Sequence, residues 1–146
     1  MQDKGALVLG AVALSGGLII LLGLSGMAQA QDLAACQGPG QDVTTAGMVA
    51  CLSEDARHWE AQMKALWPGV VAMARASDAD GMPGGAEAAL AEAQRSWLDH
   101  RLAECRWIEA QADGGSLGRV LAAACMRDKT AERVADFRDW LRQGTP

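Results

Sequence analysis

The 146-residue sequence has few of the side chains that catalytic and metal sites use. It contains only two histidines, His58 and His100, and neither lies in an H-E-x-x-H motif or beside a candidate nucleophile. The G-x-S-x-G motif of serine hydrolases is missing, and so are the closely spaced C-x-x-C pairs of zinc sites. The sequence therefore predicts no catalytic residue, no metal and no cofactor, in a protein that is not an enzyme.

The sequence contains fewer basic than acidic residues. Thirteen Lys and Arg residues face 18 Asp and Glu residues, which gives a formal net charge of −5. Proteins that bind nucleic acid present basic patches, so we expect no nucleic-acid partner. An acidic surface is compatible with a cationic protein partner, although many proteins carry such charge for solubility alone.

Charge is absent altogether from residues 5–26, which follow Lys4. The small-x-small pattern Ala28-Gln29-Ala30 comes next, and this order is typical of a secretory signal. We expect cleavage between Ala30 and Gln31, one domain over residues 31–146, and no membrane contact after cleavage. The alternative is an uncleaved membrane anchor, which the glycines of this stretch disfavour as a stable spanning helix.

Four cysteines, Cys36, Cys51, Cys105 and Cys125, all follow the predicted signal. An even number in a small exported chain predicts disulfides. One alternative concerns Cys36, because residues 33–36 (Leu-Ala-Ala-Cys) fit a bacterial lipobox in which the cysteine is lipidated. A lipobox normally adjoins the apolar run, however, whereas residues 27–32 intervene here.

The strand-like alternation of apolar and polar residues is missing after residue 30. Apolar residues instead recur every three or four positions, which is typical of amphipathic helices. The first helix should begin with Thr44 or Thr45 as its N-cap, and Pro68 should kink or split it. The Gly, Pro and Asp content of Ala76–Gly85 predicts a loop after it.

The second helix should span Ala86–Ala112 and the third Leu117–Arg142, which makes the fold all-α. Gly114-Gly115 should supply the left-handed C-cap of the second helix, and Ser116 should cap the third. The apolar stripe of the third helix comprises Leu117, Val120, Leu121, Ala124, Ala131, Val134, Phe137 and Leu141.

The short connection between the second and third helices predicts that they lie antiparallel. Cys105 lies about as far before this turn as Cys125 lies after it, so the hairpin brings the two sulfurs together. We therefore favour the pair Cys105–Cys125. This leaves Cys36 and Cys51 as the second pair, which would join the segment before the first helix to that helix. The expected architecture is a small antiparallel domain of about three long helices with two disulfides.

Arg101 lies in line with the apolar residues of the second helix. Because an unpaired buried charge is costly, its guanidinium must meet a carboxylate or backbone carbonyls, and we interpret it as a link between helices. Trp59 and Trp97 fall on apolar stripes and are predicted core residues. Trp107, next to Arg106, is expected to be half-buried at a helix seam, with an interface anchor as the alternative.

A set of motifs in the second and third helices resembles the LprI-type domain, a family of small bacterial envelope proteins named for a lysozyme inhibitor. The motifs are Gln94-x-x-Trp97-x-x-x-Arg101-x-x-x-Cys105, Gly114-Gly115-Ser116 and Cys125-x-x-x-x-Thr130-x-x-Arg133. Cys36 and Cys51 match the two early cysteines of the family. The resemblance covers about residues 35–141.

The resemblance implies an all-helical, disulfide-bonded protein that is periplasmic or secreted. It suggests a binding protein that inhibits a cationic lysozyme by protein–protein contact. The alternative is a non-inhibitory structural or stress-related envelope protein that binds another periplasmic partner. The motif residues Gln94, Trp97, Arg101, Thr130 and Arg133 also fit a structural role in joining the second helix to the third.

The chain departs from the family pattern at two places. Leu102 stands where the family commonly has Asp, and Met63, Lys64 and Trp67 stand at the positions of an L-N-x-x-Y motif. The missing Asp and Asn remove two polar partners. Arg101 must therefore be satisfied by other groups.

Overall fold

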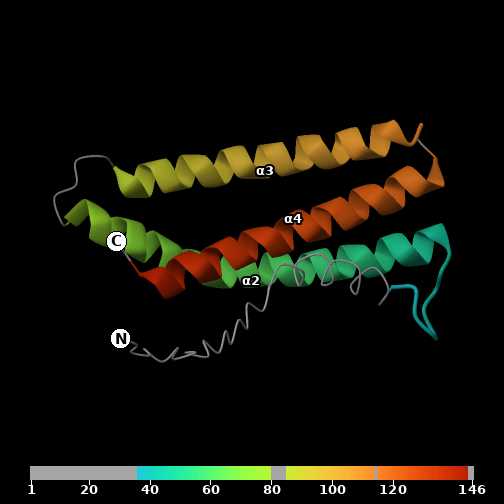
Figure 1. Ribbon diagram of the computed structural model, residues 1–146, viewed down its shortest axis with the longest axis horizontal. Coiled ribbons are helices and arrows are strands. Elements are labelled where there is room, and N and C mark those ends of the chain that lie inside the picture. Colours follow the sequence, from blue (N-terminus) through green and yellow to red (C-terminus); the bar gives the residue numbers. More distant parts are fainter. Residues whose placement is uncertain (1–35, 80–84, 114, 145–146) are drawn as a thin grey trace, which may run out of the picture.

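The computed structural model describes residues 36–79, 85–113 and 115–144. These residues form three helices, α2 (Thr45–Ala79), α3 (Ala86–Gln111) and α4 (Ser116–Gln143). Figure 1 shows α4 between the other two, crossing obliquely from α3 toward α2. The all-α, three-helix prediction is confirmed, while the predicted signal and its cleavage site at Ala30 and Gln31 lie outside the described residues.

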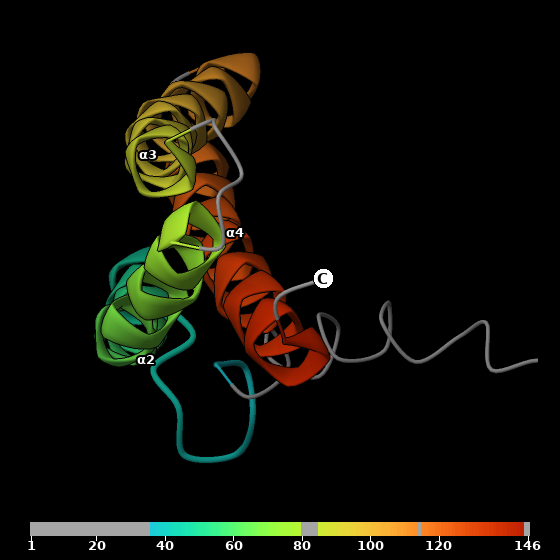
Figure 2. The same ribbon diagram turned by 90° about the vertical axis from the view of Figure 1, so that its left-hand side faces the viewer.

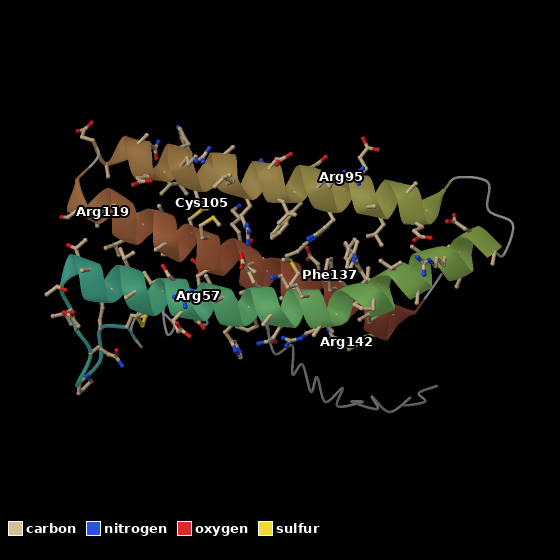
Figure 3. The ribbon with its side chains drawn as sticks, turned by 180° about the vertical axis from the view of Figure 1, so that it is seen from behind. Arg57, Arg95, Cys105, Arg119, Phe137 and Arg142 are labelled. Carbon is tan, nitrogen blue, oxygen red and sulfur yellow. A yellow bond between two sulfur atoms is a disulfide. The ribbon has the colours of Figure 1, made fainter. Side chains whose placement is uncertain are left out.

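Helix α2 starts at a cap formed by Thr44, one of the two residues predicted for that role. The Thr44 hydroxyl accepts a hydrogen bond from the backbone N–H of Gly47 at 3.1 Å, and Asp42 Oδ1 accepts one from the N–H of Thr44 at 2.9 Å. The helix then runs through Pro68 without a break and bends in its second half (Figure 3). Met63 and Val70, on either side of the proline, share one apolar cluster that holds the two halves together.

The connection from α2 to α3 is shorter than predicted, because α2 continues to Ala79 through part of the expected loop. Asp78, in this last turn, accepts hydrogen bonds from the backbone N–H groups of Ala86 at 2.6 Å and Glu87 at 3.1 Å. Arg75 forms a two-pronged pair with Glu87, with N–O distances of 2.8 and 2.6 Å. The end of α2 therefore caps the start of α3.

The turn between α3 and α4 differs in detail from the prediction. Asp113 has the left-handed conformation, with φ of 50°, which Asp adopts more readily than most residues. Gly115 does not have it, and Gly114 lies outside the described residues. Gly115, and not Ser116, is the N-cap of α4. A Cβ atom on Gly118 would lie 2.7 Å from the carbonyl oxygen of Glu109, so glycine is needed where the two helices meet.

Both predicted disulfides are confirmed. Cys36 is bonded to Cys51 and Cys105 to Cys125, with Cα–Cα distances of 5.8 and 5.6 Å. The first ties the segment before α2 to that helix, and the second joins α3 to α4. Lipidation of Cys36 is incompatible with the first disulfide, because its sulfur is already bonded.

Two apolar clusters make up the core. Buried Met63, Val70, Val134 and Phe137 form one, against which four tryptophans (Trp59, Trp67, Trp97 and Trp140) pack. The other, around Cys36, Leu52 and Val120, lies at the opposite end of α4. Phe137, on α4, is fully buried between the helices (Figure 3).

Several residues predicted to be buried lie on the surface. Leu117, Leu121 and Leu141 of the α4 stripe are exposed, because α2 and α3 leave one side of α4 uncovered (Figure 2). Trp107 is 60% exposed, so its predicted position at a helix seam is wrong. Within the described ranges, no helix has the length and apolar character needed to cross a membrane.

Candidate functional site

A buried polar layer separates the two apolar clusters. It consists of Arg101 on α3 with Arg127, Thr130 and Arg133 on α4, all at most 9% exposed. We call these four residues the arginine layer. Such a set is stable only when each charge meets polar partners, since burial of an unpaired charge is costly.

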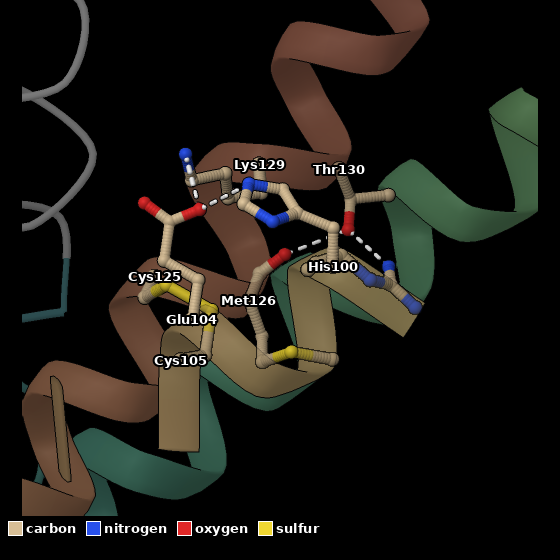
Figure 4. The surroundings of a disulfide bond; sticks show 8 residues. His100, Glu104, Cys105, Cys125, Met126, Lys129 and Thr130 are labelled. Atoms are coloured by element: carbon tan, nitrogen blue, oxygen red, sulfur yellow. Dashed lines mark hydrogen bonds and ion pairs between the residues drawn. A yellow bond between two sulfur atoms is a disulfide. The ribbon is translucent and has the colours of Figure 1, made fainter. Parts of the chain in front are cut away.

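Arg101 is held by groups from both neighbouring helices. Its Nη1 donates a hydrogen bond to the Thr130 hydroxyl at 2.6 Å, and its Nη2 lies 3.2 Å from a carboxylate oxygen of Glu60 on α2. Thr130 in turn donates to the carbonyl oxygen of Met126 at 2.6 Å (Figure 4). The guanidinium also lies 5.0 Å from the ring centre of Trp97. The predicted link between helices is therefore confirmed, and it joins all three.

Arg133 makes the second connection between α3 and α4. Its Nε donates to the side-chain oxygen of Gln94 at 3.0 Å. The guanidinium lies within 5.5 Å of the ring centres of Trp97, Phe137 and Trp140, the geometry of cation–π contacts. Burial lowers the pKa of Arg133, and the nearby Asp136 carboxylate opposes this shift. A guanidinium stays charged even so.

The structure brings together all five residues of the family motif: Gln94, Trp97, Arg101, Thr130 and Arg133. It also adds two that the sequence analysis missed, Glu60 and the fully buried Arg127, which faces Asp55 and Asp128. The spacing of apolar residues in the third helix could have predicted the burial of Arg127. Arg127 falls seven residues after Val120 and seven before Val134. This spacing places Arg127 on the buried face of α4, just as Arg101 lies on the buried face of α3.

A smaller ionic cluster flanks the Cys105–Cys125 disulfide (Figure 4). Glu104 lies 2.9 Å from Lys129 on α4 and 3.0 Å from His100 on its own helix. The hydrogen bond from Lys129 lowers the pKa of Glu104 below its ordinary value. The other histidine, His58, contacts Gln62 on the same helix. Within the described residues, no group of three or more His, Cys, Asp or Glu is placed to hold a metal ion.

A groove runs between α2 and α3, and α4 forms the floor of its larger cavity only. It consists of two adjoining cavities of about 440 and 330 Å³, both of which Glu60 lines. Its α2 wall extends from Ser53 to Trp67. Leu102 and Lys64, two of the positions where the chain departs from the family pattern, line this groove on opposite walls. We call it the α2–α3 groove.

The outer face of α3 points away from this groove. Trp107 is exposed there and is not among the residues that line the groove. Glu92 and Asp99 precede it at helical spacings that place them on the same side of α3. Both carboxylates are exposed. This outer face therefore combines a large apolar side chain with two carboxylates, and the exposed Arg106 lies at its edge toward the groove.

Comparison with known proteins agrees with the motif residues. The family described as lysozyme inhibitor LprI matches residues 36–137. An uncharacterized protein of Rhizobium meliloti (strain 1021) is 31% identical over 96 residues, which cover 62% of this chain and 69% of the relative. No solved structure matches the chain. The chain therefore belongs to the LprI lysozyme inhibitor family.

Proposed function

We propose that this protein is an exported binding protein that inhibits a cationic lysozyme by protein–protein contact. The family match over residues 36–137 carries the proposal. The two disulfides support export, because such bonds persist in oxidising compartments outside the cytoplasm. In this proposal residues 1–30 are the secretory signal, and the mature chain starts at Gln31 in the periplasm or outside the cell.

The distribution of charge supports a cationic partner. Three arginines are buried in the arginine layer, whereas no Asp or Glu is buried among the described residues. The surface is therefore richer in negative charge than the composition alone indicates. Complementary charge steers association and raises the on-rate of a cationic partner, an effect that salt screens.

The outer face of α3 is the contact surface that we propose. Tryptophan is enriched among residues that dominate binding energy at interfaces, and Trp107 is the most exposed tryptophan that the structure describes. Glu92 and Asp99, on the same side of the helix, supply charge of the sign that a basic enzyme attracts.

The proposal is tested by titrating the purified, oxidised protein into a lysozyme assay of cell-wall lysis at about 0.02 M and 0.15 M salt. We expect inhibition that saturates at a fixed stoichiometry and weakens with salt. Trp107→Ala should weaken inhibition about tenfold or more, and Glu92→Lys with Asp99→Lys should remove its salt dependence. Leu117→Ala is the matched control, because Leu117 is 62% exposed on α4. Equal lysis rates with and without excess protein, at both salt concentrations, would rule out lysozyme as the partner.

Export has its own test. Mass spectrometry of the intact protein recovered from an envelope fraction should give the mass of a chain that begins at Gln31. A chain that still begins at Met1 in that fraction would contradict cleavage.

A further inference from the structure

The three helices leave a groove between α2 and α3, at the place where a fourth helix would complete a bundle. Helix α4 packs against both α2 and α3, while those two are separated along much of their length by the α2–α3 groove. Figure 2 shows this arrangement end-on, with α2 and α3 both beside α4. The groove wall from Ser53 to Trp67 is roughly 20 Å long at 1.5 Å per residue. This length matches a helix of three to four turns.

The groove has small residues at its base and leucines at its edge. Ala56 on α2, with Ala122 and Ala123 on α4, lines the larger cavity and leaves room for a close approach. Leu98 and Leu102, one turn apart on α3, line the two cavities and are 38% and 42% exposed. An apolar stripe of a helix would bury these leucines.

The charges on the groove differ from those on the rest of the surface. Lys64 on the α2 wall and Arg106 on the α3 wall have no carboxylate partner among the described residues. Glu60 is already paired with Arg101, and Arg57 with Glu54. Glu109, at one end of the groove, is the lining carboxylate that has no ion pair within the described ranges. Each wall therefore offers an unpaired cation beside apolar surface, in a protein of net negative charge.

From these features we infer that the α2–α3 groove is a second interaction surface, which binds an acidic amphipathic helix of a partner protein. The apolar stripe of that helix lies against Leu98, Leu102 and the alanines of the floor. Its carboxylates, which flank the stripe, lie against Lys64 and Arg106. This is the helix-in-groove mode of peptide recognition, in which apolar residues at i, i+3, i+4 and i+7 supply the contacts.

The shape of the groove favours a polypeptide over a small molecule. Small ligands bind in sites that enclose most of their surface, whereas this groove is an elongated, solvent-open depression that the Arg101–Glu60 pair bridges where its two cavities meet. The charge of the walls also distinguishes its partner from a cationic lysozyme, so the groove and the outer face of α3 serve different partners.

The test uses a fluorescein-labelled synthetic peptide of about 16 residues, with leucines at the i, i+3, i+4 and i+7 positions and glutamates on both flanks. Fluorescence anisotropy with the oxidised protein gives its Kd. A second peptide has the same leucines but lysines in place of the glutamates. We expect the acidic peptide to bind and the basic peptide to bind at least about tenfold more weakly.

Variants of the protein locate the binding. Leu102→Asp should weaken binding of the acidic peptide about tenfold, while Leu121→Asp, at a leucine of similar exposure on α4 outside the groove, should not. Arg106→Glu should weaken it as well, and Arg119→Glu, an exposed cation away from the groove walls, should leave it unchanged. Circular dichroism confirms that each variant is folded.

The inference is wrong if the acidic peptide does not bind, if both peptides bind equally, or if Leu102→Asp and Leu121→Asp have the same effect. Self-association of the protein that competes with the peptide would also overturn it, because the occupant would then be a second copy of this chain. None of these outcomes changes the lysozyme assay, in which Leu102→Asp should inhibit like the unchanged protein.

Discussion

Arg101 and Thr130 join α3 to α4 through a 2.6 Å hydrogen bond at the centre of the molecule. The same guanidinium reaches Glu60 on α2, so one side chain contacts all three helices. The first prediction concerns this residue. Arg101→Met should lower the free energy of unfolding by about 3 kcal/mol, because it removes the hydrogen-bond donor to the Thr130 oxygen and the cation that pairs with the partly buried Glu60.

Urea denaturation of Arg101→Met, Thr130→Val and the double variant measures this link. The double-mutant cycle should give a coupling energy of about 1 kcal/mol or more, since the two side chains are in contact. Arg101→Lys should not restore full stability, because an ammonium group does not reproduce the planar fork of guanidinium. Additive effects of the two substitutions would show that the hydrogen bond contributes nothing to stability.

The second prediction concerns the disulfide between α3 and α4. Replacement of Cys105 and Cys125 by alanine should cost about 3 kcal/mol, because the bond restricts the unfolded chain over a sequence separation of 20 residues. Thermal unfolding of the oxidised parent and the double variant measures the difference. An unchanged melting temperature would mean that the Arg101 and Arg133 contacts hold this pair of helices without the covalent bond.

The third prediction contrasts two aromatic residues. Phe137 is fully buried and touches Trp67 and Trp140, so Phe137→Ala should cost about 3 to 5 kcal/mol. Trp107 lies on the surface, and Trp107→Ala should change stability by less than about 0.5 kcal/mol. Guanidinium denaturation compares the two variants. A large loss of stability in Trp107→Ala would make this residue part of the fold and would weaken its proposed contact role.

The fourth prediction is a pH dependence from Glu104. Its pKa is lower in the folded protein than the ordinary value of 4.5, so the unfolded chain takes up the proton first as the pH falls. The stabilising contribution is complete above about pH 4.5 and is lost as the pH falls through the lower folded value. The stability difference between the parent and Glu104→Gln should therefore be present at about pH 7 and shrink toward about pH 3.

Lys129→Met provides the matched variant for this pair, because it removes the main cause of the shift while keeping Glu104. Its stability difference from the parent should shrink over the same acidic range. Urea denaturation from pH 7 to pH 3 follows both variants. Parallel curves at all pH values would contradict the assignment.

The fifth prediction concerns Asp78, which caps α3 from the last turn of α2. Asp78→Ala should lower stability by about 1 kcal/mol, because it leaves two N–H groups of the first turn without their acceptor. Asp78→Asn should lose less, since its side-chain oxygen still accepts a hydrogen bond. Hydrogen exchange at Ala86 and Glu87 locates the effect, and unchanged exchange rates at both amides would contradict it.

Sequence periodicity predicted the three helices and both disulfides because these depend on local spacing. It also singled out Arg101, since a charge on an apolar stripe is conspicuous. The partner of Arg101 was not predictable in the same way. Glu60 lies on a helix distant in sequence, and only the arrangement of α2 and α3 around α4 brings its carboxylate across to the guanidinium.

The apolar stripe of α4 shows a second feature that the sequence did not predict, the extent of its burial. Periodicity marks the apolar side of α4 but does not say how much of that side two neighbouring helices cover. Val134 is fully buried whereas Leu117 is 62% exposed, although both lie on the predicted stripe. The α2–α3 groove has the same origin, because it exists only where α2 and α3 separate above α4.

The connectivity of the two disulfides has a consequence for biosynthesis. Each bond joins cysteines that follow one another in the chain, Cys36 with Cys51 and Cys105 with Cys125. In the export that we propose, which begins with the N-terminus, the first pair emerges and can be oxidised before the second pair appears. An oxidant that links cysteines in order of emergence therefore yields the native set directly. This consecutive connectivity is one that sequential oxidation forms without rearrangement of wrong pairs.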